Sequence, residues 1–103
     1  MLDLAEPHYD ELRAILKRRI PDIRVLAFGS RTTGSARRYS DLDLALETAV
    51  ALPLPVIFDL QEDFSTSDLP FSVDIVDMSR VSHEFRQKVL SHSLEIQPGG
   101  QPT

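Results

Sequence analysis

The sequence predicts an α+β domain in which a small β-sheet carries helices packed on one face. Segments with apolar residues at helical spacing alternate with short segments typical of strands, in the order helix, strand, strand, helix, strand, helix. A chain of 103 residues is long enough for one domain with a modest core. The face of the sheet that the helices leave open is then available for polar side chains.

The first predicted helix spans residues 6–19. Its apolar residues recur three or four positions apart: Leu12, Ile15, Leu16 and Ile20. Pro7 suits the first turn of this helix, and Pro21 ends it. Residues 24–28 are nearly all apolar and are followed by a glycine, which is typical of a buried strand.

Residues 40–47 alternate between leucines and mostly acidic residues, which predicts a strand with one core face and one carboxylate face. Prolines open a second helix over 53–64, and residues 71–77 predict a third strand. The last helix ends near residue 91 and begins at either of two possible caps, Ser79 or Ser82, and residues 94–96 add a short strand. The domain is expected to span 1–96, followed by a flexible tail over 97–103, which has no apolar residue to bury.

Composition excludes several classes of protein. The chain has no cysteine, which excludes disulfides, thiolate zinc sites and a cysteine nucleophile. Its longest apolar run is interrupted by Pro53 and Pro55 and is far too short to cross a membrane. The N-terminal segment carries Asp3 and Glu6 where a secretory signal would be basic, so a cytoplasmic protein is expected.

The charge pattern favours a compact anionic ligand over a nucleic acid. A net charge of −5 argues against a broad phosphate-backbone footprint, and no direct contact with nucleic acid is expected. Three basic residues, Arg31, Arg37 and Arg38, nevertheless fall in one predicted loop. A nucleotide triphosphate suits an acidic protein with one basic loop.

Three aspartates are candidate metal ligands. Asp41 and Asp43 stand two apart on a predicted strand, so their carboxylates project from one face. Asp74 lies within a strand that is otherwise mostly apolar, where a carboxylate loses solvation unless a cation, a donor or water reaches it. If the two strands are neighbours, the three carboxylates converge on one hard cation. Magnesium suits such a site because it takes its remaining ligands from water and substrate phosphates.

The residues before these aspartates are candidate phosphate ligands. Gly29 allows the backbone to approach a ligand closely, Ser30 offers a hydroxyl and an N–H group, and Arg31 can neutralise part of a triphosphate. Metal-held phosphates and an attacking hydroxyl together indicate nucleotidyl transfer.

The composite motif resembles the DNA polymerase β-like nucleotidyltransferase superfamily. Gly29-Ser30 is followed, after ten residues, by Asp41-x-Asp43 and then by a strand aspartate, Asp74. The short chain and the full reading Phe-Gly-Ser-Arg-Thr-Thr-Gly look like the minimal nucleotidyltransferases (MNT). The resemblance implies the nucleotidyltransferase palm, a small mixed β-sheet with helices on one face.

The same resemblance implies the roles of the site residues. Asp41, Asp43 and Asp74 would be catalytic magnesium ligands, one or two ions being bound, and Gly29 and Ser30 would hold ATP. Asp77 is the rival of Asp74 for the third position. Asp74 is favoured because its side chain opposes the apolar face of its strand, whereas Asp77 would share that face or cap the next helix.

Members of the MNT family are commonly paired with a helical HEPN protein in toxin–antitoxin systems. The implied activity is transfer of AMP from ATP to a tyrosine hydroxyl of the HEPN ribonuclease, within a hetero-oligomer. Two alternatives stay open: a catalytically silent antitoxin that neutralises its partner by direct binding, and transfer to a small hydroxyl-bearing molecule. The acceptor residue, the nucleotide selectivity and the role of Tyr39 are also open.

Overall fold

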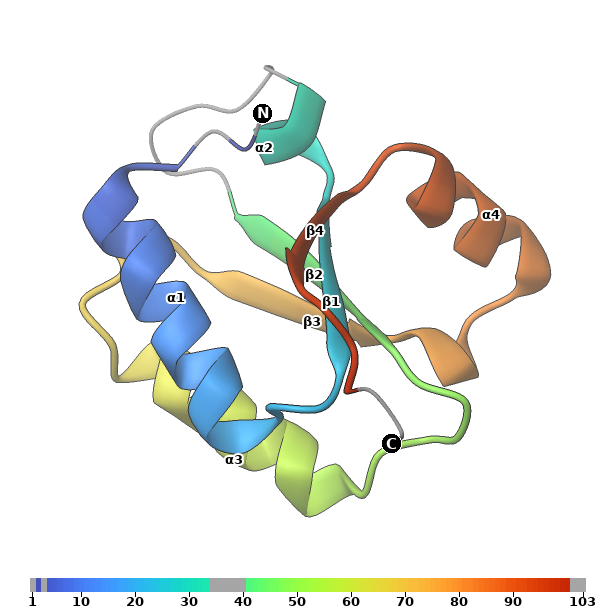
Figure 1. The fold of residues 1–103 in the computed structure, drawn as a ribbon, viewed down its shortest axis with the longest axis horizontal. Helices are drawn as coiled ribbons and strands as arrows, with labels where there is room; N and C mark the ends of the chain where they lie inside the picture. The colour runs from blue at the N-terminus through green and yellow to red at the C-terminus, as the bar shows by residue number, and fades with distance from the viewer. Residues whose placement is uncertain (1, 3, 34–40, 101–103) are drawn as a thin grey trace.

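The computed structural model describes the chain except residues 1, 3, 34–40 and 101–103 (Figure 1). In chain order its elements are α1 (Glu6–Arg19), β1 (Arg24–Phe28), α2 (Ser30–Thr33), β2 (Leu42–Glu47), α3 (Leu54–Ser65), β3 (Val73–Asp77), a short 3₁₀ helix η1 (Met78–Arg80), α4 (His83–Ser91) and β4 (Leu94–Gln97). The predicted order of long helices and strands is confirmed, and Ser82 is the cap of α4: its hydroxyl accepts a hydrogen bond from the Phe85 N–H.

The four strands form one mixed sheet in the order β3-β2-β1-β4. β1 runs antiparallel to both β2 and β4, whereas β2 and β3 are parallel. A parallel pair needs a crossover connection, and α3 supplies it. This sheet therefore matches the predicted fold class.

Two helices cover one face of the sheet and build the main core. α1 and α3 lie on the same side in Figure 1, and their leucines pack against the leucines of β2. The largest fully buried side chains are nearly all in this layer: Leu12, Leu16, Leu42, Leu44, Leu46, Leu60 and Val25. The periodicity of α1 and the alternation of β2 are both satisfied by this one core.

The expectation that all helices pack on one face is correct for α1 and α3 but wrong for α4. Val89 of α4 forms a second, smaller cluster with Leu26, Ala45 and Met78 on the opposite face, where Figure 1 draws α4. The reason is that Leu26 and Ala45 point away from the main core and would be exposed without a cover. α4 covers these two residues and leaves the rest of that face open.

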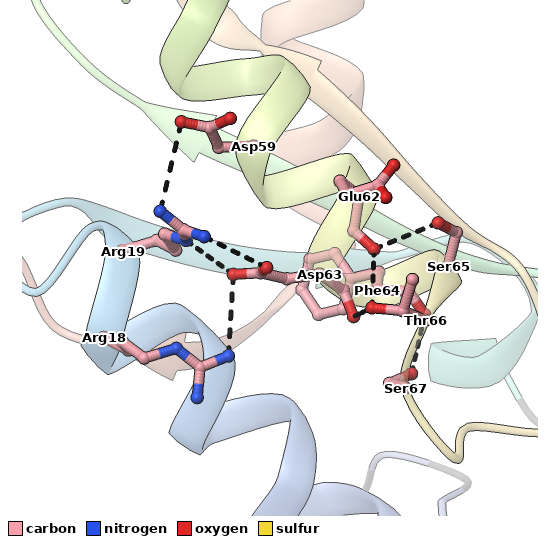
Figure 2. A network of polar contacts seen from close by, with 9 residues as sticks. All are labelled: Arg18, Arg19, Asp59, Glu62, Asp63, Phe64, Ser65, Thr66 and Ser67. Carbon is pink, nitrogen blue, oxygen red and sulfur yellow. Dashed lines mark hydrogen bonds and ion pairs between the residues drawn. The ribbon is translucent and has the colours of Figure 1, made fainter.

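Ion pairs join α1 to α3 at the surface (Figure 2). Arg19 Nε donates to Asp63 Oδ2 at 2.6 Å. Two longer ion pairs join Arg18 to Asp63 at 3.5 Å and Arg19 to Asp59 at 3.9 Å. The hydrogen bond from Arg19 lowers the pKa of Asp63. Exposed pairs of this kind contribute little stability each, so the buried leucines hold the two helices together.

The end of the described chain is attached to the turn between α1 and β1. The Gln97 side chain donates to the carbonyl oxygens of Ile20 and Ile23 at 2.7 and 2.8 Å, and the Gly100 N–H donates to Asp22 O at 2.7 Å. β4 therefore includes Gln97, one residue beyond the expected end of the domain, and the flexibility of the tail stays a prediction. Backbone acceptors, which a hydrophobicity pattern does not reveal, provide these attachments; residues 101–103 lie outside the described part.

Within the described residues, no helix combines the length and apolar character that crossing a bilayer requires.

Candidate functional site

Asp43 and Asp74 are neighbours in the sheet. They are register partners in the parallel pair β2–β3, where adjacent strands lie about 4.8 Å apart. The residues flanking them, such as Leu42 and Val73, point into the main core, so both carboxylates emerge on the opposite face. The predicted convergence of the two strands is thus present, at the end of the face that α4 leaves open.

The surroundings of Asp43 disfavour its charged form. Partial burial raises the pKa of Asp43, and the negative charges of Asp74 and Asp41 raise it further. Asp41 is exposed and lies one residue before β2. Carboxylates held this close repel one another, and a bound cation would relieve that repulsion.

Carboxylate oxygens are the type of ligand that a hard divalent cation prefers, but the side chains do not form a complete coordination site. Among the described residues, no three His, Asp or Glu side chains lie close enough together to hold a metal ion. Magnesium takes only one or two carboxylates from a protein and fills its remaining positions with water and phosphate oxygens. The Asp43–Asp74 pair with Asp41 beside it meets this smaller requirement.

Gly29 brings the backbone directly against Asp43. Its φ of +85° lies in the left-handed region, and a Cβ atom added there would overlap Asp43 Oδ2. The Gly29 carbonyl oxygen accepts hydrogen bonds from the Thr32 N–H and hydroxyl groups, at 3.0 and 2.7 Å, which fixes the turn into α2. The backbone at Gly29 therefore adjoins the Asp43 carboxylate, and α2 begins at Ser30.

Arg31 is placed differently from the other predicted nucleotide ligands. Its side chain is buried, with 6% exposed, and its guanidinium carbon lies 4.2 Å from the centre of the Phe71 ring. Stacking of this kind stabilises a guanidinium but leaves it little open surface. Contact between Arg31 and a phosphate stays a prediction, and the roles considered for Arg37, Arg38 and Tyr39 fall on residues outside the described part.

Asp77, the rival third carboxylate, is engaged elsewhere. It accepts hydrogen bonds from the Leu52 N–H at 3.0 Å and from the N–H and hydroxyl groups of Ser79 at 2.9 and 2.6 Å. Burial acts to raise the pKa of Asp77, but these hydrogen bonds and the Arg80 charge outweigh burial and lower it. Asp77 therefore caps η1 and holds the loop before α3, while Asp74 is the residue beside Asp43.

Two open pockets flank the carboxylates. One, of about 610 Å³, includes Asp74 and lies between the C-terminal half of α3 and the segment leading into β3. The other, of about 350 Å³, includes Gly29 and lies between the end of β1 and α4. Neither pocket could be predicted from the sequence, and the residues of the second meet only because α4 packs on the face that also carries Asp43.

Comparison with known proteins gives consistent matches. The family model described as "Polymerase beta, Nucleotidyltransferase" matches residues 10–97. The Probable protein adenylyltransferase MntA of Haemophilus influenzae is 40% identical over 96 residues, which cover 93% of this chain and 84% of that protein.

Solved structures of toxin–antitoxin proteins have a similar fold. A chain of a toxin–antitoxin crystal structure with AMP-PNP superposes with a TM-score of 0.73 at 25% identity, over 87% of this chain and 73% of that one. A chain from the structure of the tri-AMPylated Shewanella oneidensis HEPN toxin in complex with MNT antitoxin gives a TM-score of 0.67 at 22% identity, over 90% and 71% of the two chains. The second likeness concerns the fold alone.

Proposed function

Because the chain belongs to the polymerase beta nucleotidyltransferase family, we propose that it transfers AMP from ATP to a tyrosine hydroxyl of a cognate HEPN ribonuclease toxin and thereby acts as its antitoxin. The observation that carries the proposal is the pairing of Asp43 with Asp74 directly beside Gly29. A relative that is 40% identical is named a protein adenylyltransferase, which supports AMP as the group transferred.

The proposed reaction is an in-line displacement at the α-phosphorus of ATP. The acceptor hydroxyl oxygen forms a new bond to the α-phosphorus while the bond from that phosphorus to the β-phosphate oxygen breaks, and pyrophosphate leaves. Magnesium, held by Asp41, Asp43 and Asp74, would supply positive charge for the entering and leaving oxygens.

The chain's own residues have separate tasks in this scheme. Asp74 is exposed and lies on the edge strand β3, which supports the proposal that it takes the proton from an incoming hydroxyl. The missing side chain of Gly29 makes room for the Asp43 carboxylate, and Gly29 and Ser30 are proposed to bind the phosphates beside it. Because the reaction consumes ATP, we also propose that the protein acts in the cytoplasm.

The direct test is the intact mass of the partner. A cognate HEPN protein incubated with this chain, ATP and magnesium should gain the mass of one or more AMP units. The Asp43→Asn variant should give no gain, whereas Asp59→Asn, which alters an exposed aspartate on α3, should behave as the unaltered chain does.

Other outcomes would identify the alternative functions. A partner that is inhibited but unmodified would indicate neutralisation by direct binding. Labelled product formed from ATP and a small hydroxyl compound without any partner would indicate a small-molecule transferase.

A further inference from the structure

The pocket beside Gly29 has a composition suited to a flat aromatic ligand. Its walls are the rings of Phe28 and Phe85 and the side chain of Val89, with Gly29 at one end. The two rings meet edge to face, with centres 6.0 Å apart and planes at 87°. Pockets of a few hundred Å³ with mostly apolar walls and a few polar groups are typical of small-molecule sites.

The polar groups at this pocket come from the last turns of α4. Lys88 and His92 stand four residues apart, so they lie on one side of the helix, and both line the pocket. Lys88 brings a positive charge to a protein whose net charge is −5. Ser91 Oγ lies 2.9 Å from His92 Nδ1, which restrains the orientation of the imidazole. The pocket therefore combines apolar walls with cationic or hydrogen-bonding groups at its edge.

The sheet places this pocket next to the proposed site of phosphoryl chemistry. Phe28 is the register partner of Asp43 in the antiparallel pair β1–β2, so the two side chains emerge on the same face, about one strand spacing of 4.8 Å apart. Asp74, Asp43 and Phe28 thus form a row across three adjacent strands. A ligand whose phosphates lie at the carboxylates can extend along this row into the pocket.

We propose that the pocket formed by Phe28, Gly29, Phe85, Lys88, Val89 and His92 holds the adenine ring of ATP. This assignment rests on the proposed function and adds to it the residues that bind the base. The apolar walls remove the faces of the purine from water, and the edge of the ring is left to the polar groups of Lys88 and His92. An acceptor molecule would then approach from the opposite side, over the β3 edge and Asp74.

Calorimetric titration of the full chain with a non-hydrolysable ATP analogue and with inorganic triphosphate, both with magnesium, tests this assignment. Phe85→Ala should weaken binding of the ATP analogue by about tenfold, the effect of losing one aromatic contact with a base, and leave triphosphate affinity unchanged. Phe58→Ala is the matched control, because Phe58 is an exposed phenylalanine on α3 and should affect neither ligand. A thermal melt of each variant verifies that it is folded.

A second measurement needs no mutation. Val89 is buried and lines the pocket, so the ring current of a bound adenine should shift its methyl NMR signals, whereas triphosphate should leave them in place. Equal weakening of both ligands by Phe85→Ala, or Val89 signals unmoved by the bound ATP analogue, would overturn the adenine assignment alone. Failure of the unaltered chain to bind either ligand would overturn both this assignment and the proposed function.

Discussion

Asp43 and Asp74 are brought together by backbone pairing, and their flanking residues leave both side chains little choice of direction. Asp74 is exposed, so it is free to meet substrate, whereas Asp77 three residues later is buried in a set of hydrogen bonds. Two aspartates of one strand therefore have different surroundings: Asp74 is exposed beside Asp43, and Asp77 is buried and hydrogen-bonded.

Replacing Asp74 should lower the rate of AMP transfer without changing the stability of the fold. Asp74→Asn is expected to lower the rate of AMP transfer by about 100-fold or more, the usual effect of losing a general base, without lowering the melting temperature. The control is Asp68→Asn, at an exposed aspartate in the loop before β3. The assignment would be wrong if Asp74→Asn kept its activity while Asp77→Asn lost it without unfolding.

Replacing Asp77 should affect stability in a pH-dependent manner. Asp77→Ala leaves the Leu52 and Ser79 N–H groups without this acceptor, so the free energy of unfolding should fall by about 1–3 kcal/mol at pH 7. The pKa of Asp77 is lowered in the folded state, so its contribution is complete above the unfolded-state pKa of about 3.9 and is lost as the pH falls through the folded-state value.

Urea unfolding of both proteins at a series of pH values measures this effect. The difference in unfolding free energy between the unaltered chain and Asp77→Ala should shrink below about pH 4. A difference that stays constant or grows on acidification would show that the hydrogen bonds do not favour the ionised carboxylate.

Gly29 is required both for its backbone conformation and for its missing side chain. Gly29→Ala should cost about 1–2 kcal/mol of stability from the left-handed φ and should lower the transfer rate by roughly 100-fold, because the added methyl group displaces Asp43. The control is Gly99→Ala, since a Cβ there would lie 3.5 Å from the nearest atom, an ordinary contact. A fully active Gly29→Ala variant would contradict the close packing described at Asp43.

At the scale of elements, α4 is attached to the central strands and also lines the proposed base pocket. Its N-terminus is capped by Ser82, and Arg86 donates to Glu47 of β2 at 2.7 Å. Glu47 also accepts from Arg24 of β1 at 2.8 Å, so the helix is attached to the two central strands. The wall of the proposed base pocket depends on this attachment.

Removing the cap should weaken α4 before the rest of the fold. Ser82→Ala is expected to cost about 1 kcal/mol, whereas Ser82→Asp should restore most of it because aspartate is an equally good cap. Hydrogen exchange should show the loss of protection concentrated in residues 83–91. Uniform loss across the sheet, or no loss at all, would contradict the role given to Ser82.

The sequence predicted the elements better than their relative placement. The spacing of Leu12 and Leu16 in α1 and the alternation in β2 follow from local geometry and were sufficient to identify both. The face that α4 covers was predicted wrongly, because periodicity shows that a helix has an apolar side but not which face of the sheet it meets.

The candidate site could be predicted only in part for the same reason. The Asp41-x-Asp43 spacing places two carboxylates on one face without pairing information, and Asp74 stood out as a carboxylate within a mostly apolar strand. Asp43 is in register with both Asp74 and Phe28, and this register depends on the strand order. The residues of the pocket beside α4 are far apart in the sequence, so the pocket could not be inferred from them.

At the scale of the whole molecule, a single mixed sheet has the main hydrophobic core on one face and the proposed site on the other. One face is covered by α1 and α3, and the other carries the row of Asp74, Asp43 and Phe28 with α4 over its β1 end (Figure 1). A protein substrate can then reach Asp74 across the exposed edge of β3.

The most direct test is a crystal structure of the chain with Mn²⁺ in place of magnesium and a non-hydrolysable ATP analogue, recorded at a wavelength where manganese scatters anomalously. We expect the anomalous peak among Asp41, Asp43 and Asp74, with the phosphates of the analogue beside Gly29. A bound nucleotide whose manganese peak lies away from these three carboxylates would contradict the account.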